Sequence, residues 1–201
     1  GNIGMTLRST NSLQNSIFFS DGTSGTPEYA GYVQYNHADN TLKFGTNATE
    51  RMRIDATGAV TMPAQPAFQA IPASIQTDIA INTNVTIIFG TERFDNNADF
   101  ASNTFTAPVT GKYQFNCSLY LRNIDTAADY YELRCTTSNK TYFTIIDPGG
   151  FSGDLVYFSL VLSVLADMDA SDTCFIALTQ AGGTAQTDID TPSYFSGYLV
   201  A

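Results

Sequence analysis

Acidic side chains are the residues of this sequence best suited to chemistry, because several occur in pairs within polar stretches. The groups are Asp95 with Asp99, Asp125 with Asp129, Asp167 with Asp169 and Asp172, and Asp188 with Asp190. Two carboxylates can act as acid and base on a glycosidic bond, or they can supply oxygen ligands to Ca²⁺. The spacing fixes the geometry of neither site. We therefore interpret these residues as solvated loop carboxylates and predict no cofactor, with loop-bound Ca²⁺ as the alternative.

The one histidine, His37, lies between Asn36 and Asp39 in a stretch typical of a turn. A Ser-His-Asp triad would have to use it. The nucleophile motif Gly-x-Ser-x-Gly is absent, and the stretch 150–154 lacks a glycine at the required place. A Gly-rich phosphate loop followed by Lys is absent as well. We predict that His37 is an exposed turn residue and that the protein is not an enzyme.

The three cysteines, Cys117, Cys135 and Cys174, form no Cys-x-x-Cys pair. Their odd number and spacing indicate neither a complete disulfide framework nor a zinc site. Cys117 and Cys174 lie in apolar stretches, and we expect both to be buried as small hydrophobic side chains. Folding in a reducing cytoplasm is the simplest explanation.

The charge balance excludes two classes of partner. The 201 residues contain nine basic and 19 acidic side chains, a formal net charge of −10. Nucleic acids and anionic membrane surfaces require clustered Lys and Arg. The longest apolar run, Leu155–Leu165, is about half the ~20 residues that a membrane-spanning helix needs. We predict no nucleic-acid partner and no membrane insertion.

The stretch Thr104–Leu121 carries the clearest strand pattern. Every second residue from Tyr113 to Leu121 is apolar, and the residues between them, from Lys112 to Ser118, are polar. This period of two is typical of a strand with one face in a core. Pro108 cannot donate to a sheet, so we expect it to lie outside the pairing. We expect Gly111 to have a positive φ at the strand entry.

Similar patterns from Phe68 onward predict an all-β sandwich or barrel. The expected strands are Phe68–Ile71, Val85–Phe89, Thr104–Phe105, Lys112–Leu121, Tyr130–Thr136, Thr141–Ile146, Leu155–Leu165, Cys174–Gln180 and Tyr194–Val200. The prolines Pro63 and Pro66 disfavour helix and strand alike, and indicate a short, stiff connector. We therefore predict two domains, residues 1–65 and 66–201.

The run Leu155–Leu165 is apolar on both faces of its predicted strand, so both faces must be covered. One set of alternating residues faces the core: Val156, Phe158, Leu160, Leu162 and Val164. The other set contains Leu155, Tyr157, Val161 and Leu165, with the two serines Ser159 and Ser163 between them. A two-sheet sandwich covers only one face of a strand. The second set therefore needs another subunit or this chain's own loops.

Two motifs resemble the C1q/TNF-like domain. The first is Phe105, followed after five residues by Gly111-x-Tyr113-x-Phe115. The second is the closing stretch Tyr194–Val200, with Phe195, Gly197 and Tyr198. The family pattern has an aromatic residue or Leu seven positions before Phe105, where this chain has Ala98 with Phe100 nearby. The resemblance covers residues 68–201 and implies a homotrimeric jelly-roll head, with Tyr157, Val161 and Leu165 at the subunit interface.

The first 65 residues read as short strands separated by turns. Val33 and Tyr35 face Leu42 and Phe44 in one predicted hairpin. A second hairpin places Met52 and Ile54 against Val60 and Met62. So few large apolar side chains make a thin core, and a domain of this size buries too little surface to be stable alone. We therefore predict a β-rich segment that associates with other copies, with a marginal monomeric domain as the alternative.

The stretch 16–62 resembles a stalk repeat of phage tail-fibre proteins, most specifically in Glu50-Arg51-Met52-Arg53-Ile54-Asp55-x-x-Gly58. This resemblance implies that residues 1–65 form a β-rich trimeric stalk segment. The two resemblances together imply a bacteriophage virion protein made in the bacterial host cytoplasm. It would be the distal part of a tail fibre whose trimeric head binds a host-surface protein or glycan, and it would contact other virion proteins. The alternatives are a structural capsid fibre or decoration protein, with the jelly roll as trimerisation domain, and a non-viral C1q-like adhesin. Because residue 1 is Gly, we expect the sequence to be either a fragment of a longer protein or a chain from which a tag was cleaved.

Overall fold

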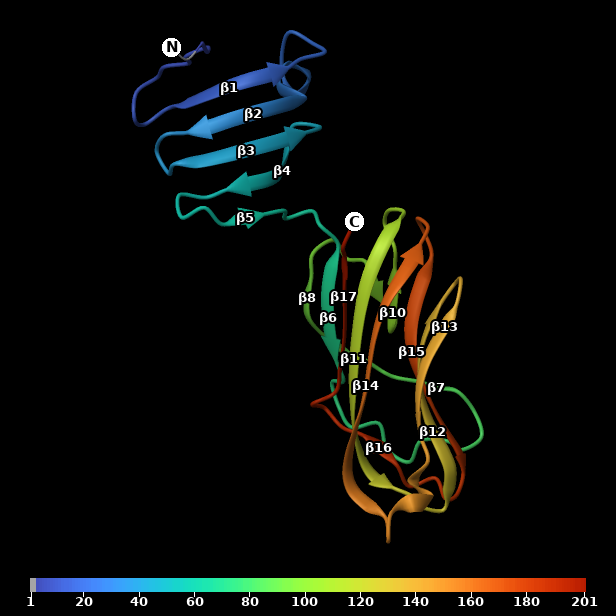
Figure 1. Ribbon diagram of the computed structural model, residues 1–201. Helices are drawn as coiled ribbons and strands as arrows, with labels where there is room; N and C mark the ends of the chain where they lie inside the picture. Colours follow the sequence, from blue (N-terminus) through green and yellow to red (C-terminus); the bar gives the residue numbers. More distant parts are fainter. Residues whose placement is uncertain (1–2) are drawn as a thin grey trace. The chain divides into compact units, whose positions relative to one another are not determined.

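The computed structural model describes residues 3–201, which form β-strands joined by turns and loops (Figure 1). The helical turns among these residues are two short 3₁₀ helices, η1 (Thr26–Tyr29) and η2 (Pro148–Gly150). In the described part of the chain no helix is long and apolar enough to cross a membrane. The chain divides into two compact units, one ending at Ala64 and the other spanning Gln65–Ala201. We refer to them as the N-terminal and C-terminal units.

The N-terminal unit is one antiparallel sheet in which each strand pairs with the next along the chain. Its strands are β1 (Gln14–Phe19), β2 (Gly31–Asn36), β3 (Thr41–Thr46), β4 (Thr49–Ile54) and β5 (Val60–Thr61). Val33 lies opposite Phe44, and Tyr35 lies opposite Leu42, which confirms the first predicted hairpin. The pairing of Ile54 with Val60 confirms the second.

The C-terminal unit is a jelly-roll sandwich of two antiparallel sheets, as the strand pattern predicted. One sheet has the order β13-β12-β15-β10-β9, with β7 beside β15. Its strands are β7 (Val85–Thr86), β9 (Phe100–Ala101), β10 (Thr104–Thr106), β12 (Ala128–Thr137), β13 (Thr141–Ile146) and β15 (Thr173–Gly182). The other has the order β14-β11-β17-β6-β8, with β16 beside β11. Its strands are β6 (Ala67–Ile71), β8 (Thr91–Asp95), β11 (Gly111–Ile124), β14 (Leu155–Met168), β16 (Asp188–Ile189) and β17 (Tyr194–Leu199).

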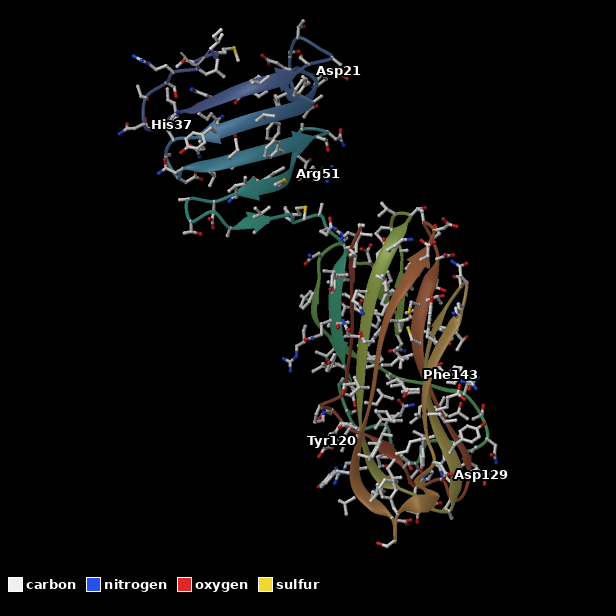
Figure 2. The ribbon with its side chains drawn as sticks, viewed as in Figure 1. Asp21, His37, Arg51, Tyr120, Asp129 and Phe143 are labelled. Atoms are coloured by element: carbon white, nitrogen blue, oxygen red, sulfur yellow. The ribbon has the colours of Figure 1, made fainter. Side chains whose placement is uncertain are left out.

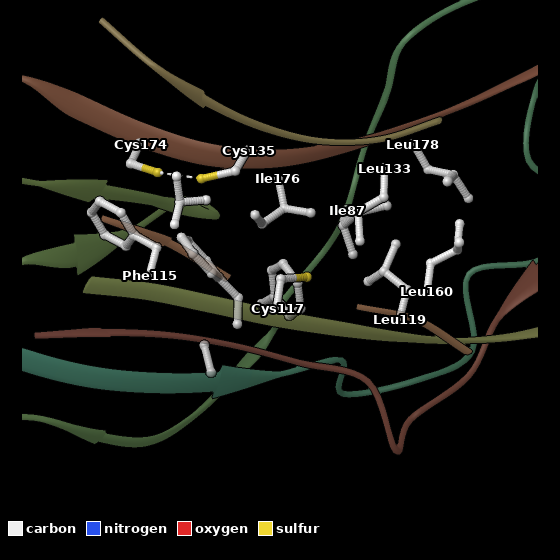
Figure 3. Packing of buried hydrophobic residues seen from close by; sticks show 14 of the residues in the cluster. Ile87, Phe115, Cys117, Leu119, Leu133, Cys135, Leu160, Cys174, Ile176 and Leu178 are labelled. Carbon is white, nitrogen blue, oxygen red and sulfur yellow. Dashed lines mark hydrogen bonds between the residues drawn. The ribbon is translucent and has the colours of Figure 1, made fainter. Parts of the chain in front are cut away.

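Strand β11 supplies the centre of the core. Its alternate residues from Tyr113 to Leu121 are all buried, which confirms the predicted alternation. Figure 3 shows Phe115, Cys117 and Leu119 facing side chains of the opposite sheet, among them Ile176. The polar residues between them therefore point away from the core, onto the outward face of the β14-β11-β17 sheet.

A cluster of phenylalanines closes the end of the core where β6, β10 and β17 meet. Phe68 stacks on Phe100 at 4.8 Å and on Phe105 at 5.0 Å between ring centroids, and Phe195 meets Phe68 edge-on at 5.0 Å. Phe100 thus places in the core the aromatic ring that the family pattern has at the position of Ala98. A Cβ atom at Gly197 would lie 2.6 Å from Cδ1 of Phe115, so this packing requires glycine.

The role predicted for Gly111 was wrong. Its backbone lies outside the left-handed region. A Cβ atom there would lie 2.7 Å from the carbonyl oxygen of Ala201 and 2.7 Å from Cδ1 of Leu199. The position needs a small residue because the C-terminal end of the chain passes close to the start of β11, where Lys112 N donates to Ala201 O.

The strand predictions were least accurate between β6 and β10. The strand expected over Val85–Phe89 ends at Thr86, and the buried Ile87 and Phe89 belong to the following loop. The short strands β8, β9 and β16 were not predicted. Every residue of β8 before Asp95 is exposed, so its sequence carries no alternating pattern to detect.

Candidate functional site

The outward face of the β14-β11-β17 sheet carries the three residues that the sequence assigned to an interface. Tyr157, Val161 and Leu165 of β14 are 54%, 60% and 54% exposed. Leu160 and Val164 of the same strand point into the core. The two faces predicted for this strand therefore exist over most of its length, and Tyr157, Val161 and Leu165 are more than half exposed on the outward one.

Residues of β11 and β17 extend this face across the sheet. Leu165 lies opposite Gln114, which lies opposite Tyr198, and Val161 lies opposite Ser118, which lies opposite Tyr194. Residues directly opposite each other in an antiparallel pair project from the same face. The register thus builds two rows, each with large apolar or aromatic groups on both sides of a polar residue.

A polar row lies between these two. Asn116 lies opposite Ser163 on β14 and Ser196 on β17. Nε2 of Gln114 donates to Oγ of Ser163 at 2.9 Å, and that hydroxyl donates to Oδ1 of Asn116 at 2.8 Å. These hydrogen bonds fix polar side chains in the middle of the face, so a partner that buries it would meet oriented donors and acceptors as well as apolar surface.

An aromatic and cationic group occupies the end of the face nearest the start of β14. Tyr120 stacks on Tyr157 with ring centroids 5.5 Å apart, and Figure 2 labels Tyr120 on this side of the unit. The guanidinium of Arg122 lies over the Tyr157 ring at 5.8 Å and pairs with Asp190 at 3.4 Å. The stacking and the cation–π contact favour one orientation of Tyr157.

A second exposed apolar surface lies on the edge strand β13 of the other sheet. Phe143 and Ile145 are 60% and 53% exposed, and Phe143 is labelled in Figure 2. Strands β13 and β14 stand at the ends of their sheets and contact each other. The same lateral edge of the sandwich therefore carries both strands.

Val156 occupies another position than the sequence indicated. Val156 was expected to face the core but is 61% exposed. Beside it the β11–β14 register omits Asn123, whose φ of 54° interrupts the regular alternation. Tyr198 of the closing motif points outward beside Gln114, whereas Phe195 and Gly197 of the same strand are buried.

The acidic groups organise loops. The Asp95 carboxylate accepts the N–H groups of Asp99 at 3.1 Å and Phe100 at 2.8 Å. Asp188 accepts the N–H of Asp78 at 3.0 Å. Asp125 is buried rather than solvated, because its carboxylate accepts backbone N–H groups from two loops, among them that of Ala127 at 2.8 Å. Residues 3–201 contain no group of three or more His, Cys, Asp or Glu side chains arranged to hold a metal ion.

All three cysteines are buried and free, which confirms the prediction for Cys117 and Cys174. Sγ of Cys135 lies 3.3 Å from Sγ of Cys174, across the neighbouring strands β12 and β15 (Figure 3). Burial raises the pKa of the Cys117 and Cys174 thiols well above its usual value. A thiol that stays protonated is a poor nucleophile, so this group suits packing rather than catalysis.

The expected exposure of His37 was wrong. Its ring meets Tyr35 edge-on with centroids 4.9 Å apart, and its backbone N–H donates to the carbonyl oxygen of Leu13 at 3.0 Å. The segment before β1 therefore lies against this turn and leaves the histidine partly buried. Among the described residues, Nε2 of His37 has no hydrogen-bond partner, and no serine or carboxylate bonds the ring as a catalytic triad would require.

The sequence missed the polar row and the stacked tyrosines of the outward face. Gln114 and Asn116 were recognised only as polar positions between core residues. The antiparallel pairing of β11 with β14 brings them to Ser163, and the sequence does not give that register. An alignment of the two alternating patterns by their apolar faces would have narrowed the choice of register.

The fold of the C-terminal unit is shared with known proteins. A family model described as "C1q domain" matches residues 67–200. The globular domain of zebrafish complement 1qA protein is 18% identical, with a TM-score of 0.50 over 68% of this chain and 98% of that chain. Murine APRIL, crystallised at pH 8.0, is 8% identical, with a TM-score of 0.50 over 68% and 99%. No curated protein sequence matches.

At these identities the solved structures support the fold alone. The family match covers most of the C-terminal unit, including the core motif from Phe105 to Phe115 and the closing strand β17. The match does not include the N-terminal unit, which ends at Ala64. On this basis the chain belongs to the C1q domain family.

Proposed function

We propose that three copies of this chain assemble through their C-terminal units. In the proposed ring, the edge of one copy that carries Phe143 and Ile145 packs against the outward face of β14, β11 and β17 of the next. A closed ring needs two different patches on each copy, one for each neighbour. The edge and the face supply two such patches, and family membership supports a trimer over other rings.

The observation that carries this proposal is the exposure of Tyr157, Val161 and Leu165 on one regular strand. Full burial of one such side chain stabilises by about 1.5–3 kcal/mol. The three together would contribute on the order of 5 kcal/mol per interface before the cost of association. Large apolar side chains that gather on one face of a sheet, here with Ser159 and Ser163 between them, mark an interaction surface.

We further propose that the protein is the distal part of a phage tail fibre or similar appendage, and that its trimeric head binds a protein or glycan of the host surface. The resemblance of Glu50–Gly58 to a tail-fibre repeat supports this, together with the two-unit organisation. Three identical heads raise the strength of individually weak contacts by avidity. The function requires no catalysis, and other virion proteins would be its remaining partners.

The assembly is tested by measuring solution mass with light scattering at micromolar concentration. The wild type should have three times the chain mass of 21.7 kDa. The variant Val161→Asp should have the mass of one chain, because a carboxylate replaces an apolar contact. Ile88→Asp is the matched control, since Ile88 is 53% exposed but lies in the loop after β7. A monomeric wild type, or equal dissociation of both variants, would contradict the proposal.

Host binding is tested with the labelled wild type and its Val161→Asp variant on a panel of bacterial strains and purified surface polysaccharides. We expect binding to some members of the panel and a loss of at least about 100-fold in apparent affinity for the monomeric variant. A bound polysaccharide should keep its viscosity during incubation. Binding to no member would favour a purely structural fibre or decoration protein.

A further inference from the structure

Two of the three buried thiols contact each other inside the core of the C-terminal unit. Sγ of Cys135 on β12 lies 3.3 Å from Sγ of Cys174 on β15, and Figure 3 shows the two sulfur atoms facing each other. The side chains are 1% and 0% exposed. Cys117 lies on β11 of the opposite sheet. The core thus contains one dithiol pair and one separate thiol, and the proposed assembly uses neither.

The strand register brings the two sulfur atoms together. Cys135 lies opposite Ile176 and Cys174 lies opposite Thr137, so the cysteines are diagonal neighbours on the inward face of their sheet. Diagonal partners in a regular sheet have Cα atoms about 7–8 Å apart, and a disulfide needs about 4.4–6.8 Å. The side chains have closed most of this gap. A disulfide bond of about 2.05 Å requires the sulfur atoms to approach by only about 1.3 Å more.

Both cysteines lie near strand ends, where the backbone can supply such a shift. Cys135 is two residues before the end of β12, and Cys174 is the second residue of β15. The residues 138–140 that follow β12 are exposed. Ser138 N donates to Thr173 O at 3.0 Å, and Thr173 N donates to Oγ of Ser138 at 2.8 Å. Strand ends open more readily than strand centres, so a small reagent can reach the pair from this end.

We propose that Cys135 and Cys174 form an oxidation site, at which a peroxide converts the two thiols into a disulfide that locks β12 to β15. One sulfur attacks a peroxide oxygen, the O–O bond breaks, and a sulfenic acid and the first water form. The second sulfur then attacks the sulfenic sulfur, the S–S bond forms, and the S–O bond breaks. The departing hydroxide takes the proton of the second thiol and leaves as water. The two electrons that the thiols lose reduce one peroxide to two waters.

The environment of the pair makes this reaction slow. Burial raises the pKa of the Cys174 thiol well above its usual value, and a protonated thiol is a poor nucleophile. We therefore expect oxidation over hours, with the rate set by the opening of the strand ends. The thiol of Cys117 is buried as well, and it should stay reduced because the register gives it no sulfur neighbour on an adjacent strand.

The bond would stabilise the C-terminal unit. It joins residues 135 and 174, which are 174 − 135 = 39 positions apart, and it encloses β13 and β14. Closing a loop of this length restricts the unfolded chain, so the oxidised unit should unfold at a higher temperature. Reducing cytoplasm keeps thiols reduced, so a head made there would gain the lock after release. This use of the site depends on the proposed virion function, whereas the bond itself does not.

The test treats the reduced full-length protein with millimolar hydrogen peroxide for hours under native conditions. The intact mass should fall by about 2 Da through the loss of two hydrogen atoms. Peptide mapping without reductant should recover a peptide pair joined through Cys135 and Cys174, with Cys117 still a thiol. The thermal midpoint should rise by about 5 °C or more, at one protein concentration, and dithiothreitol should reverse both changes.

Two variants separate the pair from the third thiol. Cys117→Ala removes an equally buried thiol and should behave as the wild type does, whereas Cys135→Ala should show neither the mass loss nor the rise in midpoint. Three thiols that survive in the treated wild type, a bond to Cys117, or added oxygen in place of the bond would overturn the proposed site. A bond without a rise in midpoint would overturn the lock. Light scattering of the same samples tests the trimer separately, so the two proposals fail by different results.

Discussion

Replacement of Gly197 by alanine tests how tightly the aromatic core is packed. A Cβ atom at this position would lie 2.6 Å from Cδ1 and 2.8 Å from Cε1 of Phe115, and 2.8 Å from Cε1 of Phe68. Both rings are only 1% exposed. Phe68 stacks on two further rings at 4.8 and 5.0 Å, so it has no free direction in which to move.

The expected cost follows from that geometry. Adding a carbon atom to a well-packed core costs about 1–3 kcal/mol, and three contacts below 3.0 Å place Gly197→Ala at the upper end. The same change reduces the entropy of the unfolded chain, which stabilises by about 0.4–1 kcal/mol. We expect a net loss of about 2 kcal/mol in the free energy of unfolding. With a urea m-value of about 2 kcal/mol per M, the midpoint should fall by about 1 M.

The assay is urea unfolding followed by tyrosine fluorescence, at one protein concentration because association adds to apparent stability. Gly153→Ala is the matched control. A Cβ atom at Gly153 meets nothing within 4 Å, so this variant reports the unfolded-state effect alone. If Gly197→Ala fell within about 0.5 kcal/mol of the control, the rings would have room to move, and the inferred packing would be refuted.

Three further predictions concern buried polar groups, thiols and pH. Tyr131→Phe should cost about 1–3 kcal/mol in urea unfolding, because the buried hydroxyl accepts the N–H of Asp125 at 2.9 Å and bonds Thr187 at 2.7 Å; an unchanged midpoint would contradict this. The three buried cysteines should react with iodoacetamide in the native protein at least about 100-fold more slowly than after unfolding, as followed by mass spectrometry. NMR titration should place the pKa of Asp154 below its ordinary value of 3.8, because the Thr126 N–H donates to it, and the pKa of Asp99 above 3.8, because burial disfavours its charged form. The stability that Asp154 contributes is then present above pH about 3.8 and is lost as the pH falls through its folded-state pKa. Ionisation of Asp99 opposes folding as the pH rises. A higher pKa for Asp154 than for Asp99 in the titration would contradict both assignments.

The success of the strand predictions depended on whether a strand has one buried face. Strand β11 alternates strictly from Tyr113 to Leu121, so the sequence specified both its existence and its inward residues. Strand β8 has no buried face over most of its length, and it was missed. The sequence pattern records burial, and strands that are held by hydrogen bonds alone leave no such record.

Other errors came from contacts between distant parts of the chain. A side chain at position 111 would collide with the carbonyl oxygen of Ala201. His37 is partly covered by the segment that contains Leu13. Val156 is exposed where the neighbouring strand has Asn123 with a positive φ of 54°. Each outcome depends on which residues meet in the folded chain. Local spacing describes the residue and its neighbours in sequence, so it could not supply that information.

The same alternating pattern has different meanings in the two units. In β11 it marks a face that the opposite sheet covers, with Leu119 and Leu121 fully buried. In β2 and β3 it marks an equally apolar face, from Val33 to Phe44, that no second layer of its own unit covers. A sequence records that a face avoids water, but not whether the covering surface comes from the same chain. The alternation in β2 and β3 therefore specifies these strands and their apolar face, whereas the surface that covers the face lies outside the local pattern.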